Sequence, residues 1–182
     1  MQKYFNKNDR IKAFKELMSG GYQPVQCDHL AKVLDDMGFF DAPASTKYHG
    51  NFTGGLYEHS EDVTRNLVWL TEKLGLTWEH PRSPYLVGML HDLCKCDLYA
   101  QQPDGTFLFR DDRPLTGHGD KSVILAQQIA DLTEEEVLCI RWHMGAYDDS
   151  KYWSAIGRAI EKYPNVLYTH TADMIASRIH GV

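Results

Sequence analysis

The sequence contains no run of about eighteen apolar residues, the length that a membrane-spanning helix needs. Its first seven residues are not followed by the apolar core of a secretion signal. The cysteines are few and lack the two-residue spacing of zinc knuckles and redox motifs. We therefore expect a reduced, cytoplasmic protein that does not associate with membranes. Its cysteines are Cys27, Cys94, Cys96 and Cys139.

An excess of positive charge is also missing, because the formal net charge is -6 over 182 residues. Proteins that bind nucleic acids through the phosphate backbone are usually basic, so we do not expect a nucleic acid partner. A small anionic substrate is still compatible with this charge, since a bound cation can supply positive charge locally.

No internal repeat, low-complexity run or long linker divides the chain, and its length suits one domain with one core. We therefore predict a single domain over residues 1–182. Apolar residues recur mostly at helical spacing, which predicts an all-α fold. One small β-hairpin is expected near residues 96–110, where Pro103-Asp104-Gly105 is typical of a turn. Helices are predicted over residues 9–18, 26–37, 56–74, 85–93, 118–132, 134–144, 151–161 and 164–179.

Local signals support several of these helix starts. Ser83-Pro84 predicts an N-cap followed by proline in the first helical turn. Thr133 and Glu136 have the spacing of a capping box. Residues 39–53 are predicted to form a loop, which either covers a pocket through Lys47, Tyr48 and His49 or is a surface loop without a role.

The apolar segment Leu86–Leu90 leads directly into the pair His91-Asp92, with Lys95 three residues further on. An imidazole and a carboxylate at the end of a buried segment can share a metal ion. At this composition roughly one His-Asp dipeptide is expected by chance, so the pair is informative only together with further ligands.

The other predicted helices supply candidates for those ligands. His59, His118 and His143 each lie on or beside an apolar face, although a single histidine there is more often a hydrogen-bonded core residue. Asp173 also lies on an apolar face, where an unpaired carboxylate costs several kcal/mol. A metal ion would remove that cost. Imidazole and carboxylate ligands without thiolate suit Mn, Fe, Co, Mg or Zn.

This order of residues resembles the HD-domain superfamily of metal-dependent phosphohydrolases. The family pattern is an early His, an adjacent His-Asp pair and a late Asp, which match His59, His91-Asp92 and Asp173. Members with two metals have two further histidines, and His118 and His143 stand where these are expected. The resemblance covers about residues 48–178 and implies an HD-domain helical bundle, with the helices of residues 9–38 packed on it. Leu93-Cys94 departs from the pattern, because many members carry Ile-Gly there.

The resemblance also implies two divalent metal ions and a role for each ligand. His59, His91, Asp92 and Asp173 would bind the first ion, and Asp92 would bridge to a second ion held by His118 and His143. Lys95 would contact a phosphate oxygen or the bridging hydroxide, unless it is only a solvated lysine. Asp62 would orient a ligand or the attacking water, unless it is a surface acid. Further candidate substrate contacts are Lys47, Tyr48, Arg65, Lys121 and Arg141.

The expected function is hydrolysis of a phosphomonoester or phosphodiester, in a nucleotide or similar small metabolite, by metal-activated water. A second hypothesis is a di-iron oxygenase of the HD type, because the ligand set does not separate the two chemistries. A third is a non-catalytic, nucleotide-binding regulatory module, against which the complete ligand set argues. The oligomeric state is not predicted.

Overall fold

A computed structural model describes residues 2–46 and 50–182 of the chain. The described residues do not include Lys47, Tyr48 and His49, so the substrate contacts predicted for them stay predictions. The fold is mostly helical with a single two-stranded hairpin, which confirms the predicted class. The helices are α1 Lys7–Met18, α2 Pro24–Asp36, α3 Gly55–Leu74, α4 Ser83–Leu90, α5 Gly119–Ala126, α6 Glu134–Trp142, α7 Trp153–Lys162 and α8 Asn165–Met174.

In the described ranges, four shorter helical turns follow α4, α6 and α8. Three are 3₁₀ turns, and the last is a π-helical turn that continues α8. They are η1 Leu93–Asp97, η2 Gly145–Tyr147, η3 Ser150–Tyr152 and η4 Ile175–His180. None of the helices in the described ranges has the length and apolar character needed to span a bilayer.

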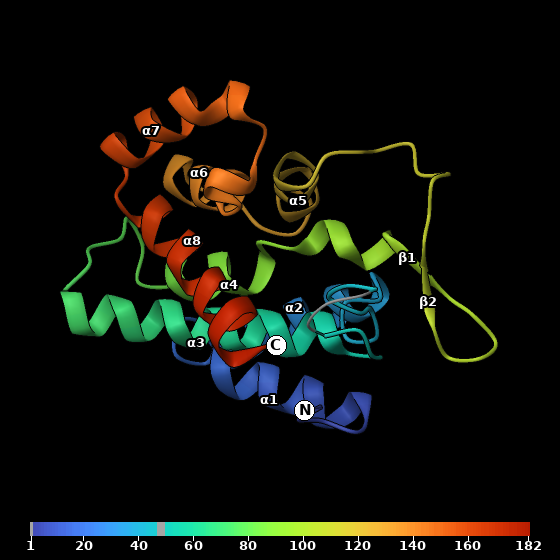
Figure 1. Cartoon of the computed structure of the whole chain (residues 1–182). Coiled ribbons are helices and arrows are strands. Elements are labelled where there is room, and N and C mark those ends of the chain that lie inside the picture. Colours follow the sequence, from blue (N-terminus) through green and yellow to red (C-terminus); the bar gives the residue numbers. More distant parts are fainter. Residues whose placement is uncertain (1, 47–49) are drawn as a thin grey trace.

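Helix α4 lies inside the fold and packs against α1, α3, α6 and α8 (Figure 1). Its residues Leu86, Val87, Met89 and Leu90 are buried. Gly88 lets α4 approach α3 closely, since a Cβ atom there would stand 2.6 Å from the Cα atom of Thr64. This contact brings the end of α4 beside the first turns of α3.

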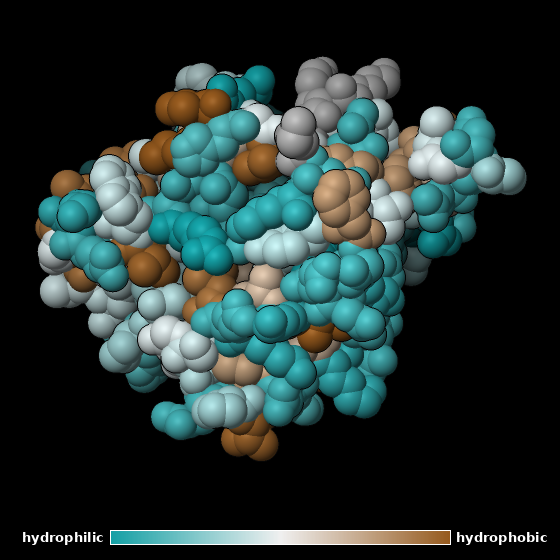
Figure 2. Space-filling model, turned by 90° about the horizontal axis from the view of Figure 1, so that it is seen from below, coloured by the Kyte–Doolittle hydropathy of each residue, from teal (hydrophilic) through white to brown (hydrophobic). Residues whose placement is uncertain are grey.

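Helix α1 lies on the opposite side of α3 from α5, α6 and α7, and α2 packs against α1 (Figure 1). The predicted loop between α2 and α3 belongs partly to the core, because Phe39 and Phe40 are fully buried. The ring of Phe40 meets that of Phe14 edge-on at 5.6 Å. The face seen from below is mostly hydrophilic, with apolar residues in separate small groups (Figure 2).

Helices α4 and α5 end earlier than their apolar pattern predicts, and α6 does so by only two residues, at Trp142. Helix α4 ends at Leu90, so Asp92 lies in a tight turn with φ −110° and ψ 20° instead of inside the helix. Helix α5 ends at Ala126, because Gln128 and Ile129 form tighter i to i−3 hydrogen bonds there. The apolar residues predicted for α5 still pack on the core, but some of them lie in the turn that follows the helix.

The predicted helix starts and hairpin have different outcomes. The capping box of Thr133 is confirmed. The N-cap prediction for Ser83 is wrong, since its hydroxyl donates to Glu136 Oε1 at 2.8 Å and Arg82 precedes the helix instead. The hairpin is confirmed as β1 Tyr99–Gln101 antiparallel to β2 Phe107–Phe109.

Candidate metal centre

Asp92 lies at the centre of a cluster of histidines, and its side chain is 2% exposed. One carboxylate oxygen, Oδ2, lies 3.5 Å from His59 Nε2 and 3.4 Å from His91 Nε2. The other oxygen, Oδ1, lies 2.9 Å from His118 Nε2 and 3.5 Å from His143 Nε2. The two oxygens therefore each face a separate pair of imidazoles.

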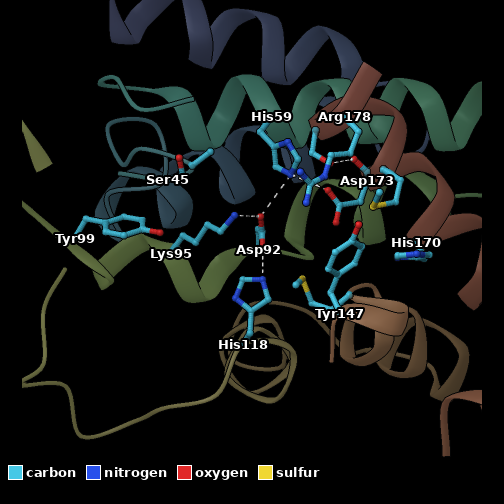
Figure 3. A pocket seen from close by; sticks show the side chains of 14 residues that line it. Ser45, His59, Asp92, Lys95, Tyr99, His118, Tyr147, His170, Asp173 and Arg178 are labelled. Atoms are coloured by element: carbon cyan, nitrogen blue, oxygen red, sulfur yellow. Dashed lines mark hydrogen bonds and ion pairs between the residues drawn. The ribbon is translucent and has the colours of Figure 1, made fainter. Parts of the chain in front are cut away.

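Asp173 joins the cluster from α8, with its Oδ1 atom 3.3 Å from His59 Nε2 (Figure 3). All six residues predicted as ligands thus converge in one place, although they come from distant parts of the sequence. His59 is on α3, and His91 and Asp92 follow α4. His118 precedes α5, His143 follows α6 and Asp173 is on α8.

Helix ends orient two of the histidines. His91 stands at the C-cap of α4 and His143 at the C-cap of α6. The last carbonyls of a helix have no partner within it. His91 Nδ1 bonds such a carbonyl, that of Gly88, at 2.8 Å, and His143 Nδ1 bonds that of Ile140 at 2.7 Å. Each ring is thereby turned so that Nε2 faces Asp92.

His59 is oriented in a similar way by the C-terminal segment. Its Nδ1 atom bonds the backbone oxygen of Val182 at 2.9 Å. Because a carbonyl oxygen only accepts, the hydrogen of each of these rings lies on Nδ1, and Nε2 carries a lone pair when the ring is neutral. The Nε2 atoms of His59 and His91 face each other at 3.3 Å. Two lone pairs at this distance repel each other unless a cation lies beside them.

The donor set fits a metal ion in two further respects. Asp92 Oδ1 and His143 Nε2 are buried acceptors, and neither makes a well-aligned hydrogen bond to another described residue. An octahedral ion with bonds of about 2.1 Å separates neighbouring ligand atoms by about 3.0 Å. The separations around Asp92, from 2.9 to 3.5 Å, are close to that value. These buried His and Asp groups can hold metal ions.

The charge states of the cluster suit a cation. Burial raises the pKa of Asp92, but the Lys95 ammonium and the imidazoles of His91 and His118 outweigh it and hold that pKa well below its usual range. Burial likewise raises the pKa of Asp173, and His59 more than offsets it. Burial lowers the pKa of His118 below its usual value. Carboxylates are thus ionised and His118 is neutral at pH 7, as metal binding requires.

Lys95 is the nearest cation, with Nζ 2.6 Å from Asp92 Oδ2. Burial lowers its pKa, but the Asp92 carboxylate raises it by more, so the ammonium stays charged. Lys95 also lines the cavity that opens over the cluster (Figure 3). The contact of Lys95 with a phosphate oxygen or hydroxide stays a prediction.

Cys94 adds a thiol that the predicted ligand set did not contain. Its Sγ atom lies 3.0 Å from His118 Nδ1, on the side of the ring away from Asp92. Burial raises the pKa of Cys94 to about 12, so the sulfur is a thiol at neutral pH. Asp92, Cys94 and His118 are close enough to share an ion. We interpret Cys94 as a support for the His118 ring, because a neutral thiol is a poor metal ligand.

A cavity of about 230 Å³ opens onto the cluster. It reaches His59, Asp92, His118 and Asp173 and extends between the loop before α3, the hairpin and α8 (Figure 3). Ala44 places part of the predicted loop at this cavity. Several residues of its walls were not predicted from the sequence, since most stand on loops, short turns or a strand where helical spacing says nothing about orientation. These residues include Ser45, Tyr99, Met144, Tyr147, Met174, Ser177 and Arg178.

Apart from the ligands His91 and His143, which are buried beneath it, four predicted site residues in the described part of the chain do not line the cavity. Asp62 accepts from His180 Nδ1 at 2.7 Å, and Arg65 pairs with Glu61 at 2.7 Å. Lys121 is buried and paired with Asp97. Arg141 is paired with Asp120 and Asp148 and covers the ring of Trp142 at 3.9 Å. These charges are satisfied within the fold, so we leave the four residues out of the site proposed below.

Comparison with known proteins found a partial relative. The chain is 36% identical over 70 residues to the dihydroneopterin 2',3'-cyclic phosphate phosphodiesterase of Methanocaldococcus jannaschii. The match covers 37% of this chain and 28% of the length of that relative. No family model and no solved structure matches. The chain therefore has distant, partial homology to a phosphodiesterase.

Proposed function

We propose that this protein is a metal-dependent phosphohydrolase that cleaves a phosphodiester or phosphomonoester of a nucleotide or similar small metabolite. The observation that carries the proposal is the division of the histidines between the two oxygens of Asp92. A carboxylate with separate donor pairs on its two oxygens is suited to bridge two ions. His59, His91 and Asp173 would hold one ion, and His118 and His143 the other.

Two bound divalent ions supply a nucleophilic hydroxide at neutral pH and neutralise charge on the phosphoryl oxygens. The residues of the chain orient and complement that centre. Asp92 and the hydrogen-bonded imidazoles would hold the ions in place. The Lys95 ammonium faces the cavity beside Asp92 Oδ2, where it would donate to a phosphate oxygen.

Two observations favour a small phosphodiester as the substrate. The partial relative is named for the cyclic phosphodiester dihydroneopterin 2',3'-cyclic phosphate. The net charge of -6 argues against a nucleic acid polymer, which would need many phosphate contacts. We therefore favour a phosphodiester, and a cyclic phosphate in particular, of a heterocyclic metabolite.

The test is hydrolysis of nucleoside 2',3'-cyclic phosphates and of phosphomonoesters by the purified protein. The metal content is measured first, and Mn, Mg, Fe, Co and Zn are then added separately after treatment with a chelator. We expect metal-dependent hydrolysis that the chelator abolishes. Oxygen uptake by an iron-loaded protein, without hydrolysis, would instead support the oxygenase. Metal binding without turnover of any phosphorylated compound would support the regulatory module.

A further inference from the structure

One end of the cavity is walled by two aromatic rings and two thioethers, from Met144, Tyr147, His170 and Met174. Tyr147 and His170 lie on one side of Asp92, whereas Lys95 and Tyr99 lie on the opposite side (Figure 3). The cavity therefore has the Lys95 ammonium at one end, where Tyr99 also lies, and two rings with two thioethers at the other. A substrate with a phosphate and a flat ring has the same division.

The fold keeps Tyr147 exposed at this wall. Its side chain is 59% exposed, although the residue lines the cavity. Gly145 makes the turn possible, with φ +54°, and a Cβ atom there would stand 2.8 Å from the ring of His170. His170 is held in turn by a hydrogen bond from its Nδ1 atom to the carbonyl of His143, at 2.7 Å. His143 therefore holds His170 in this wall through its backbone, while its own imidazole faces Asp92.

Arg178 closes the wall from the π-helical turn η4. Its guanidinium carbon lies 5.5 Å from the centre of the Tyr147 ring, and the side chain lines the cavity. In the described part of the chain no carboxylate pairs with Arg178, unlike the arginines at positions 65 and 141. The segment that carries it is fastened by the contact of His180 with Asp62 and by Val182 on His59.

We propose that this wall is a subsite for the flat heterocycle of the substrate, with Tyr147 as the stacking platform and Arg178 as a donor to the ring. Stacking needs an exposed aromatic face, and thioethers contact rings favourably. A guanidinium only donates, so it favours a ring edge with adjacent acceptors, such as the carbonyl oxygen and ring nitrogen of guanine or a pterin, over the amino group of adenine. The subsite rests on the proposed function, because it assumes that the phosphate binds at the metals.

The first experiment compares two cyclic phosphates on the metal-loaded protein: guanosine 2',3'-cyclic phosphate and glycerol 1,2-cyclic phosphate, which has no ring system to stack. For Tyr147→Ala we expect KM to rise about 5- to 150-fold for the guanosine compound, the range for loss of one stacked base. Its kcat, and both constants for the glycerol compound, should change less than about twofold. Tyr147→Phe keeps the ring and should restore the wild-type KM.

The matched control is Trp153→Ala, because Trp153 is 54% exposed but does not line the cavity. This variant should leave kcat and KM unchanged for both substrates. For Arg178→Met we expect loss of any preference for guanosine over adenosine 2',3'-cyclic phosphate, since adenine presents an amino group instead of a carbonyl. Equal effects of Tyr147→Ala on the guanosine and glycerol compounds would overturn the subsite.

A binding measurement separates failure of the subsite from failure of the proposed function. Calorimetry with guanosine, which has the ring but no phosphate to hydrolyse, requires no turnover. Weaker binding to Tyr147→Ala than to the wild type, by about 5-fold or more, would support the subsite even if neither cyclic phosphate is hydrolysed. Equal binding by the two proteins would contradict it, even if both cyclic phosphates are hydrolysed.

Discussion

At the scale of single residues, the candidate centre depends on which nitrogen of each imidazole carries hydrogen. His91 and His143 donate from Nδ1 to carbonyls that the ends of α4 and α6 leave unpaired. Partners of this kind orient a ligand and raise its basicity. The backbone therefore prepares these rings for a cation without any additional charged residue.

Asp92→Asn tests the bridge directly. The amide has nearly the same shape, but it lacks the negative charge shared by the two groups of imidazoles. We expect loss of bound metal and a decrease in hydrolysis of more than about 100-fold, since even the partners of ligands contribute 10- to 100-fold. Metal content and the rate of hydrolysis are measured together. Asp62→Asn is the control and should stay within about tenfold, and full metal content in Asp92→Asn would refute the bridge.

His143→Ala tests whether two ions are bound. This histidine faces Asp92 Oδ1, whereas His59 and His91 face Oδ2. We expect the variant to lose one ion and keep the other, as measured by metal analysis after dialysis. His170→Ala removes a nearby histidine that faces none of these oxygens and should leave the stoichiometry unchanged. An unchanged stoichiometry in His143→Ala would favour a single-metal site.

Asp173 predicts a pH dependence for the stability of the chelated protein. Its pKa is held below the usual range, by His59 against the effect of burial. The folded state therefore gains stability above the unfolded pKa of about 3.9, and that gain is lost as pH falls through the folded pKa. Urea unfolding at pH 6, 4 and 3 measures it. Asp173→Asn should show a smaller loss between pH 6 and 3, and an identical loss would contradict the assignment.

At the scale of elements, the close contact of α3 and α4 places His59 beside His91. Gly88→Ala tests this contact, because the added methyl group would meet the backbone of Thr64. We expect destabilisation of about 1–3 kcal/mol, the usual cost of overpacking, measured by thermal or urea unfolding. Gly157→Ala on α7 is the control. No atom lies within 4 Å of its added Cβ, so it should stabilise the protein by about 0.4–1 kcal/mol.

The sequence predicted the elements whose apolar spacing is regular and missed features that depend on turns. The long helix α3 and the capping box of α6 follow from periodicity and local hydrogen bonding. The early ends of α4 and α5 do not, because tighter turns there satisfy the same apolar contacts. Tyr147 and Arg178 were missed since η2 and η4 depart from the period of 3.6 residues, so helical spacing does not show which side they face.

At the scale of the whole molecule, the six predicted ligands connect α3, α4, α5, α6 and α8. Their convergence was predictable because each stands on an apolar face or at its end. The sequence could not show that four other predicted residues stay away from the cavity, since any nearby element can neutralise a charged residue on a helix. These residues are Asp62, Arg65, Lys121 and Arg141.

A ligand set spread over so many helices should make stability depend on metal. A ligand at about 1,000 times its Kd stabilises the folded state by about 4 kcal/mol. For a chain of this length that corresponds to a rise in Tm of about 8–16 °C. Calorimetric scans with a chelator and with added Mn or Zn measure this rise. Asp92→Asn should show almost none, and an equal rise in that variant would indicate binding elsewhere.

The hydrogen bond between His59 Nδ1 and the backbone oxygen of Val182 has a consequence for hydrogen exchange. An ion on Nε2 makes Nδ1–H a stronger donor, so metal binding and docking of the last residues favour each other reciprocally. The amide of Val182, which bonds the carbonyl of Ala176 at 3.1 Å, would then exchange with deuterium more slowly when metal is bound. The exchange rate of the Val182 amide, which lies outside the cavity, would therefore indicate whether metal is bound at the centre.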